Sequence, residues 1–164
     1  MNGRILYLLK SAFWLMALIM LAGCTSSSPR IPASYHLSFL AHPQLSQSAP
    51  LKISVLQLAS DIDFMTTDFW SLQRQTQQAL GGDVLHIGQL WLRAGQLNQN
   101  LSGDITAGAR YIGIIAQYPA PDGKVWRLSL PLASEQRSFA IWPGSPEALR
   151  AEIVVDINGM RALR

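Results

Sequence analysis

Apolar and polar residues alternate with a period of two along several short stretches of the chain, as in strands with one buried face. Tyr35, Leu37 and Phe39 alternate with polar residues, and Pro43 ends the stretch. The run 51–59 is apolar on both faces near its end, which indicates burial on two sides. The same criteria predict further strands at 84–92, 109–118, 125–130, 138–142 and 152–157. Of these, the almost wholly apolar segment 109–116 should be a central strand.

The period changes to that of a helix after residue 66. Four residues share one helical stripe: Phe69, Leu72, Thr76 and Leu80. Either Thr66 or Thr67 is expected to cap the start of the helix. Gly81 and Gly82 should end it, because glycine readily takes the left-handed conformation found beyond a helix C-terminus. Several closely spaced strands and one inserted helix predict a mainly β fold, a two-sheet β-sandwich.

Turn residues separate these elements. Asp61 and Asp63 mark a short turn before the helix. The run Pro121-Asp122-Gly123 predicts a turn, since proline presets φ and glycine accepts positive φ, and it should make Tyr118 and Val125 hairpin neighbours. The segment from His42 to Pro50 is bounded by prolines and filled with Ser and Gln, so we expect an exposed loop.

The first 24 residues have the layout of a secretory signal. Arg4 and Lys10 precede an apolar run at 12–21, and small residues follow it. The run is shorter than the roughly 20 residues that a membrane-spanning helix needs. The tetrad Leu21-Ala22-Gly23-Cys24 resembles the lipobox of bacterial lipoproteins, in which the cysteine thiol is acylated and becomes the first residue of the mature protein. The alternative is a buried free cysteine.

We therefore expect a lipoprotein signal peptide over 1–23, a lipidated tether over 24–33 and a β-sandwich domain over 34–164. Cys24, the single cysteine, is the predicted lipidation site, and a multiply acylated cysteine such as one carrying palmitate holds a bilayer firmly. Loss of Arg4 and Lys10 with the signal peptide lowers the formal charge of +3 by two. Charge thus gives no reason to expect a nucleic acid partner.

The remaining residues offer little chemistry. His36, His42 and His86 show no metal-ligand spacing, and the chain has no G-x-S-x-G elbow and no phosphate-binding glycine loop. We predict a protein that is not an enzyme, with no metal, no small-molecule substrate and no cofactor apart from the covalent lipid. A serine-histidine-aspartate site built on His36 or His86 from distant residues stays open, because such triads assemble only in the fold.

Aromatic residues supply the main alternative function. Rings that stand exposed can bind carbohydrate or peptidoglycan, whereas spaced aromatics in β-rich proteins more often belong to the core. The candidates are Phe64, Phe69, Trp70, Trp91, Tyr111, Trp126 and Trp142. A periplasmic lipoprotein that binds carbohydrate would use Trp91, Trp126 or Trp142. Arg127 either stacks or bonds beside Trp126, or lies exposed on an edge.

The order of the motifs resembles a known family. The lipobox is followed by Pro50-Leu51-x-Ile53-x-Val55-Leu56-Gln57-Leu58, Phe64 with Asp68-Phe69, Leu80-Gly81-Gly82-Asp83, Tyr111-Ile112-Gly113-Ile114-Ile115-Ala116 and Trp126-Arg127. Over nearly the whole chain this order is similar to the type VI secretion system outer-membrane lipoprotein family (TssJ/SciN).

The resemblance implies a transthyretin-like β-sandwich with one inserted helix. It implies that the protein is a lipoprotein anchored in the inner leaflet of the outer membrane and facing the periplasm. It also implies docking of the periplasmic C-terminal region of the IcmF-like protein TssM, with TssL as an indirect partner in the membrane complex. The loop between the first two strands should carry that contact: His42, Pro43, Gln44, Leu45, Ser46, Gln47, Ser48 and Ala49. We expect Leu45, the large apolar residue of this polar loop, to enter a partner pocket beside Gln44 and Gln47. The alternative is that Leu45 packs on its own domain.

Overall fold

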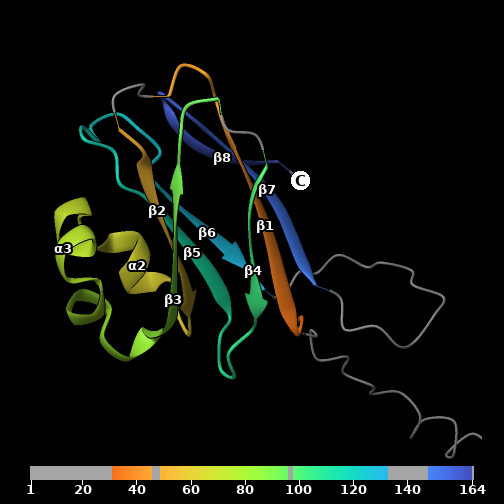
Figure 1. Ribbon diagram of the computed structural model, residues 1–164. Coiled ribbons are helices and arrows are strands. Elements are labelled where there is room, and N and C mark those ends of the chain that lie inside the picture. The colour runs from red at the N-terminus through yellow and green to blue at the C-terminus, as the bar shows by residue number, and fades with distance from the viewer. Residues whose placement is uncertain (1–30, 46–48, 96–97, 133–147, 164) are drawn as a thin grey trace, which may run out of the picture.

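The computed structural model describes residues 31–45, 49–95, 98–132 and 148–163. Within these residues the strands are β1 (Ser34–Ala41), β2 (Leu51–Leu58), β3 (Val84–Leu92), β4 (Gln99–Asp104), β5 (Tyr111–Ala116), β6 (Arg127–Pro131), β7 (Leu149–Asp156) and β8 (Gly159–Leu163). They form a first sheet in the order β4-β1-β7-β8 and a second sheet in the order β3-β2-β5-β6 (Figure 1). All neighbours pair antiparallel except β1 and β7, which are parallel. The predicted mainly β, two-sheet sandwich is confirmed.

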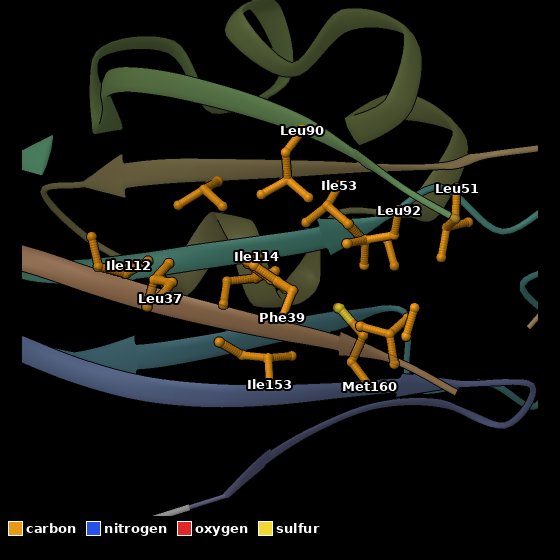
Figure 2. Close-up of a cluster of buried hydrophobic side chains, with 14 of the residues drawn as sticks. Leu37, Phe39, Leu51, Ile53, Leu90, Leu92, Ile112, Ile114, Ile153 and Met160 are labelled. Carbon is orange, nitrogen blue, oxygen red and sulfur yellow. The ribbon is translucent and has the colours of Figure 1, made fainter. Parts of the chain in front are cut away.

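The core lies between the two sheets and follows from the period of two. Alternate residues of each strand point inward, so Leu37 and Phe39 of β1 face Ile53 and Ile114 of the second sheet (Figure 2). These side chains are fully buried. Burial of each such side chain contributes roughly 1.5 to 3 kcal/mol. The central strand predicted at 109–116 is confirmed over Tyr111–Ala116, because β5 lies between β2 and β6.

Helices cover the outer face of the second sheet. The segment between β2 and β3 forms α2 (Ile62–Thr66), α3 (Phe69–Leu80) and a 3-10 turn (Gly81–Asp83). Phe64, Leu72 and Leu80 pack onto Leu56 and Leu58 in a second apolar cluster. Strand β2 is therefore buried on both faces near its end, as the sequence predicts.

The ends of the long helix differ in part from expectation. Gly81 ends α3 with φ of 55°, as predicted. The start is capped by Asp68, whose carboxylate accepts the backbone N–H of Ser71 (3.0 Å), and the prediction of Thr66 or Thr67 is wrong. Thr66 belongs instead to α2, where its hydroxyl donates to the Ile62 carbonyl (3.0 Å). The predicted turn at Asp61 and Asp63 is this short helix.

The sequence pattern did not predict two edge strands, and one strand that it did predict falls outside the described residues. Strand β4 has the polar sequence Gln-Asn-Leu-Ser-Gly-Asp, and β8 has five residues. Each lies at an edge of the first sheet, so pairing with β1 or β7 fixes its conformation where apolar alternation is weak. The predicted strand at 138–142 lies outside the described residues.

The β5–β6 connection also differs from expectation. Lys124 N–H donates to the Pro121 carbonyl (3.0 Å), and Gly123 has φ of 71°, which confirms the turn. Ile115 pairs with Arg127, but Tyr118 does not pair with Val125. Val125 instead forms a bridge to Gly159 of the first sheet. The hairpin opens there because β8 offers the Val125 backbone a different partner.

The two ends of the sandwich carry different segments. The N-terminal end contains Ile31 to Ala33, and Ala33 accepts the N–H of Ile105 there (2.8 Å). The opposite end, called the loop end below, contains the β1–β2, β5–β6 and β7–β8 connections, at the top of Figure 1. Strand β1 has 8 residues and so separates the two ends by about 26 Å.

Candidate docking surface

The β1–β2 loop begins as a continuation of the sheet and then turns sharply. His42 N–H donates to the Val155 carbonyl (2.9 Å), which extends the pairing of β1 with β7. Leu45 N–H donates to the His42 carbonyl (2.8 Å), which closes a turn with Pro43 in the second position, where proline is favoured. Gln44 N–H donates to Nδ1 of His42 (3.2 Å). The first half of the predicted docking loop is therefore ordered on the sandwich.

Leu45 does not project from this loop. Its side chain is 3% exposed and belongs to the core between the sheets. The expectation of an exposed Leu45 that enters a partner pocket is wrong, and the alternative, packing on its own domain, is what the structure shows. The turn at Pro43 folds the chain back over the end of β1, so Leu45 fixes the loop and His42, Pro43, Gln44 and Ala49 remain exposed. Ser46, Gln47 and Ser48 lie outside the described residues.

Neighbouring segments complete the surface of the loop end. Val125 and Ile157 have exposed side chains, and neither was among the predicted site residues. Below them, the Tyr118 hydroxyl donates to the Asp156 carbonyl (3.0 Å). Burial, and then the Asp156 carboxylate, raise the pKa of the Tyr118 phenol well above its usual value, so the phenol remains protonated and keeps this bond. A signal that the sequence did contain is Asp156, whose carboxylate accepts the N–H of Asn158 (2.7 Å) in the turn Ile157-Asn158.

The histidines do not come together. His36 and Ser102 form a hydrogen bond on the exposed outer face of the first sheet, with Nδ1 and Oγ 2.7 Å apart. The partner that the structure gives His36 is thus a hydroxyl on an open sheet face, whereas His86 lies on β3 and His42 in the loop. Within the described residues no three histidine, cysteine or acidic side chains are grouped so that they could hold a metal ion.

The predicted aromatic residues divide between core and surface. Phe64 and Phe69 are buried, and Trp126 packs edge-to-face on Phe69 with ring centroids 5.0 Å apart. Trp91 is exposed on β3, at the opposite edge of the second sheet from Trp126. These two rings therefore do not form a carbohydrate platform. Trp142 lies outside the described residues.

Arg127 makes both of the contacts considered for it. Its guanidinium stacks over the Trp126 ring at 4.5 Å from the centroid, and Nη1 donates to the carbonyls of Phe64 (3.0 Å) and Thr67 (2.6 Å). Burial lowers the pKa of Arg127. Two residues on, Ser129 donates to the Asp61 carboxylate (2.6 Å). Strand β6 thus holds both ends of α2.

In the part of the chain that the structure describes, no helix has the length and apolar character needed to cross a bilayer.

Comparison with known proteins gives one consistent group. Residues 34–158 match the family model described as "Type VI secretion lipoprotein, VasD, EvfM, TssJ, VC_A0113". A comparison with curated protein sequences gives no match. The chain is similar to Serratia marcescens Lip, a membrane bound component of the type VI secretion system, at 42% identity and a TM-score of 0.74. The match covers 82% of this chain and 100% of that one.

More distant structures share the fold. The T6SS lipoprotein TssJ1 from Pseudomonas aeruginosa has 22% identity and a TM-score of 0.67, over 80% of this chain and 95% of that one. A chain in a structure of the T6SS protein TssM C-terminal domain from EAEC has 21% identity and a TM-score of 0.58. That match covers 80% of this chain and 98% of the other.

Proposed function

Because the chain belongs to the type VI secretion lipoprotein family, we propose that it ties the outer membrane to the IcmF-like protein TssM. In this proposal the lipid on Cys24 sits in the inner leaflet of the outer membrane, and the body of the protein lies in the periplasm. The loop end binds the periplasmic C-terminal region of TssM, and TssL is an indirect partner in the membrane complex. The role is mechanical and requires no catalytic step.

The observation that supports this proposal is that the N-terminal entry of the chain and the β1–β2 loop lie at opposite ends of the sandwich. The chain reaches the sandwich at Ile31, and the β1–β2 loop begins at His42, with the full length of β1 between them. A lipid on the N-terminal side therefore leaves the loop facing away from the membrane. β1 is hydrogen-bonded on both sides, to β4 and β7, so a pull between the two ends acts on a strand in the middle of a sheet.

The comparisons support the choice of partner. A chain with this fold occurs in a structure of the TssM C-terminal domain. At 21% identity the likeness concerns the fold, so the docking itself remains a proposal.

Replacement of the loop residues around Leu45 tests the docking. The variant changes Gln44 and Gln47 to Ser and changes Ser46 and Ser48 to Gly. Leu45 is kept, because it belongs to the core. Binding of the full-length lipoprotein in detergent to the TssM periplasmic fragment should weaken by about tenfold or more, because the replacement changes several contact residues at once. The matched control changes Thr106 and Ala107, which are exposed at the N-terminal end, and should bind as the wild type does. Equal affinity of the loop variant and wild type would contradict the proposal.

Substitution of Cys24 by serine tests the anchor. The Cys24→Ser protein should no longer fractionate with outer membranes and should not support secretion, because serine does not take the thioether lipid. Its sandwich should unfold at the wild-type temperature, because the domain begins after this residue. A Cys24→Ser protein that still floats with outer membranes would show that another attachment operates.

A further inference from the structure

The described part of the docking loop presents no large apolar side chain. Leu45 is buried, so the exposed residues are His42, Pro43, Gln44 and Ala49. Protein interfaces usually depend on a few apolar or aromatic anchors at the centre of a polar border. If the loop end binds a protein, such anchors must come from the segments beside the loop.

Val125 and Ile157 have the required exposure. Their side chains are 51% and 46% exposed, on the β5–β6 and β7–β8 connections. The two segments are tied together: Val125 N–H donates to the Asn158 carbonyl (3.1 Å), and Met160 N–H donates to the Val125 carbonyl (2.7 Å). The Lys124 ammonium donates to the Ile157 carbonyl. An apolar pair held in this way loses little conformational freedom on binding.

Gly159 allows the two segments to approach so closely. Its φ is 128°, a conformation that other residues rarely adopt. A Cβ at this position would lie 2.6 Å from the carbonyl oxygen of Val125. The placement of Val125 beside the β7–β8 turn is therefore built into the backbone.

The pair adjoins the β1–β2 loop. Parallel pairing matches Ala41 with Val155, and the bond from His42 N–H to Val155 continues it. The pairing ends there, so the turn at Pro43 and the turn at Ile157 leave adjacent strands at the same end of the first sheet. Figure 1 shows the orange β1–β2 loop, the blue β7–β8 turn and the teal β5–β6 loop gathered at the same end.

Chain length excludes the N-terminal segment as the cover for this pair. Seven residue steps separate Cys24 from Ile31, and they span at most about 25 Å when fully extended. The pair lies beyond the far end of β1, about 26 Å from Ser34, with Ile31 three residues further back. A segment whose first residue is held in the membrane does not reach it. The N-terminal segment is therefore not the occupant, whereas a partner molecule can approach the pair from the side opposite the lipid.

We infer that Val125 and Ile157 form the apolar centre of the docking surface and enter an apolar pocket of the TssM periplasmic region. The turn from His42 to Leu45 forms the polar border beside them. This inference rests on the proposed function and adds to it the source of the apolar anchors.

The experiment measures binding of full-length lipoprotein in detergent to the TssM periplasmic fragment. The variants are Val125→Ser, Ile157→Ser and the double change, with Leu163→Ser as the matched control. Leu163 is 44% exposed in the first sheet. It lies at the far end of β8 from the loop end, where it pairs with Glu152. Each single change should weaken binding about tenfold, mostly through faster dissociation, and the control by less than about twofold. Thermal midpoints should stay at the wild-type value, because all three side chains are exposed.

The outcomes separate the two proposals. If the wild type fails to bind the fragment, the proposed function itself is wrong. If the loop replacement weakens binding and the Val125→Ser, Ile157→Ser protein binds normally, docking stands and this inference is overturned. Equal loss in Leu163→Ser would also overturn it. The inference would also be overturned if the wild type forms dimers and the double variant does not, while the double variant still binds TssM. The occupant of the pair would then be a second copy of this chain.

Discussion

The outer faces of the two sheets are built from the same kind of strand but carry opposite chemistry. On the second sheet, Leu56, Leu58 and Ile115 point outward and are buried under α2 and α3. On the first sheet, His36 and Ser38 point outward into solvent. The difference arises because the helices inserted between β2 and β3 lie over the second sheet, whereas no helix of the described residues lies over the first (Figure 1).

The side chains on each outer face find partners on that face. On the open face, His36 bonds to Ser102 (2.7 Å) and Ser38 donates to Asn100 (2.9 Å). On the covered face, the helices bury the apolar side chains, and Arg127 holds them in place. Contacts within the protein thus account for these groups on both faces, whereas the loop end is the surface for which we propose recognition.

The largest expected effect concerns the covered face. Phe64 is fully buried between α2 and the sheet, so Phe64→Ala should lower the free energy of unfolding by about 3 to 5 kcal/mol. The matched change on the open face, His36→Ala, should cost no more than about 0.5 kcal/mol. Chemical denaturation of both variants measures the difference. Similar losses in the two variants would show that the helices are not part of one cooperative core.

A smaller effect is expected where the helices are attached. Arg127→Met removes the donors to the Phe64 and Thr67 carbonyls and should cost about 2 kcal/mol, the size typical of charged hydrogen bonds. The control is Arg161→Met, which breaks an ion pair with Asp156 (3.0 Å) on an arginine that is 62% exposed. That change should cost less than about 1 kcal/mol. A greater loss in Arg161→Met would contradict the role given to Arg127.

Long patterns of apolar residues predicted several elements correctly. Strand β1 buries alternate residues, β2 is buried on both faces, and α3 buries Phe69, Leu72 and Leu80 although the helix kinks at Gln75 (φ −141°, ψ 47°). Strands β4 and β8 are short edge strands that depend on pairing with β1 and β7, and helix α2 has 5 residues, too few to show a period. Asp156 and Gly159, the turn-favouring residues on either side of Ile157-Asn158, would have indicated the turn that precedes β8.

The candidate site was harder to predict because its arrangement depends on contacts between distant segments. The position of the loop at 42–49 followed from its prolines and polar residues. The burial of Leu45 depends on the turn at Pro43, and the exposure of Val125 depends on its bridge to Gly159. No pattern within either segment contains that information.

The smallest expected effect concerns the cap of α3, on the covered side of the comparison. Bonds from the Ser71 hydroxyl and backbone N–H lower the pKa of Asp68 below its usual value. Its charge therefore stabilises the fold above pH about 4, and this contribution is lost as the pH falls through the lowered pKa. Asp68→Asn keeps a capping oxygen but does not titrate, so its thermal midpoint should lie slightly below that of the wild type at pH 7, and the gap should close in acid. Asp122→Asn, an exposed change in the β5–β6 turn, controls for the lost charge. A constant gap between Asp68→Asn and wild type from neutral to acid pH would show that the carboxylate charge does not stabilise the helix start.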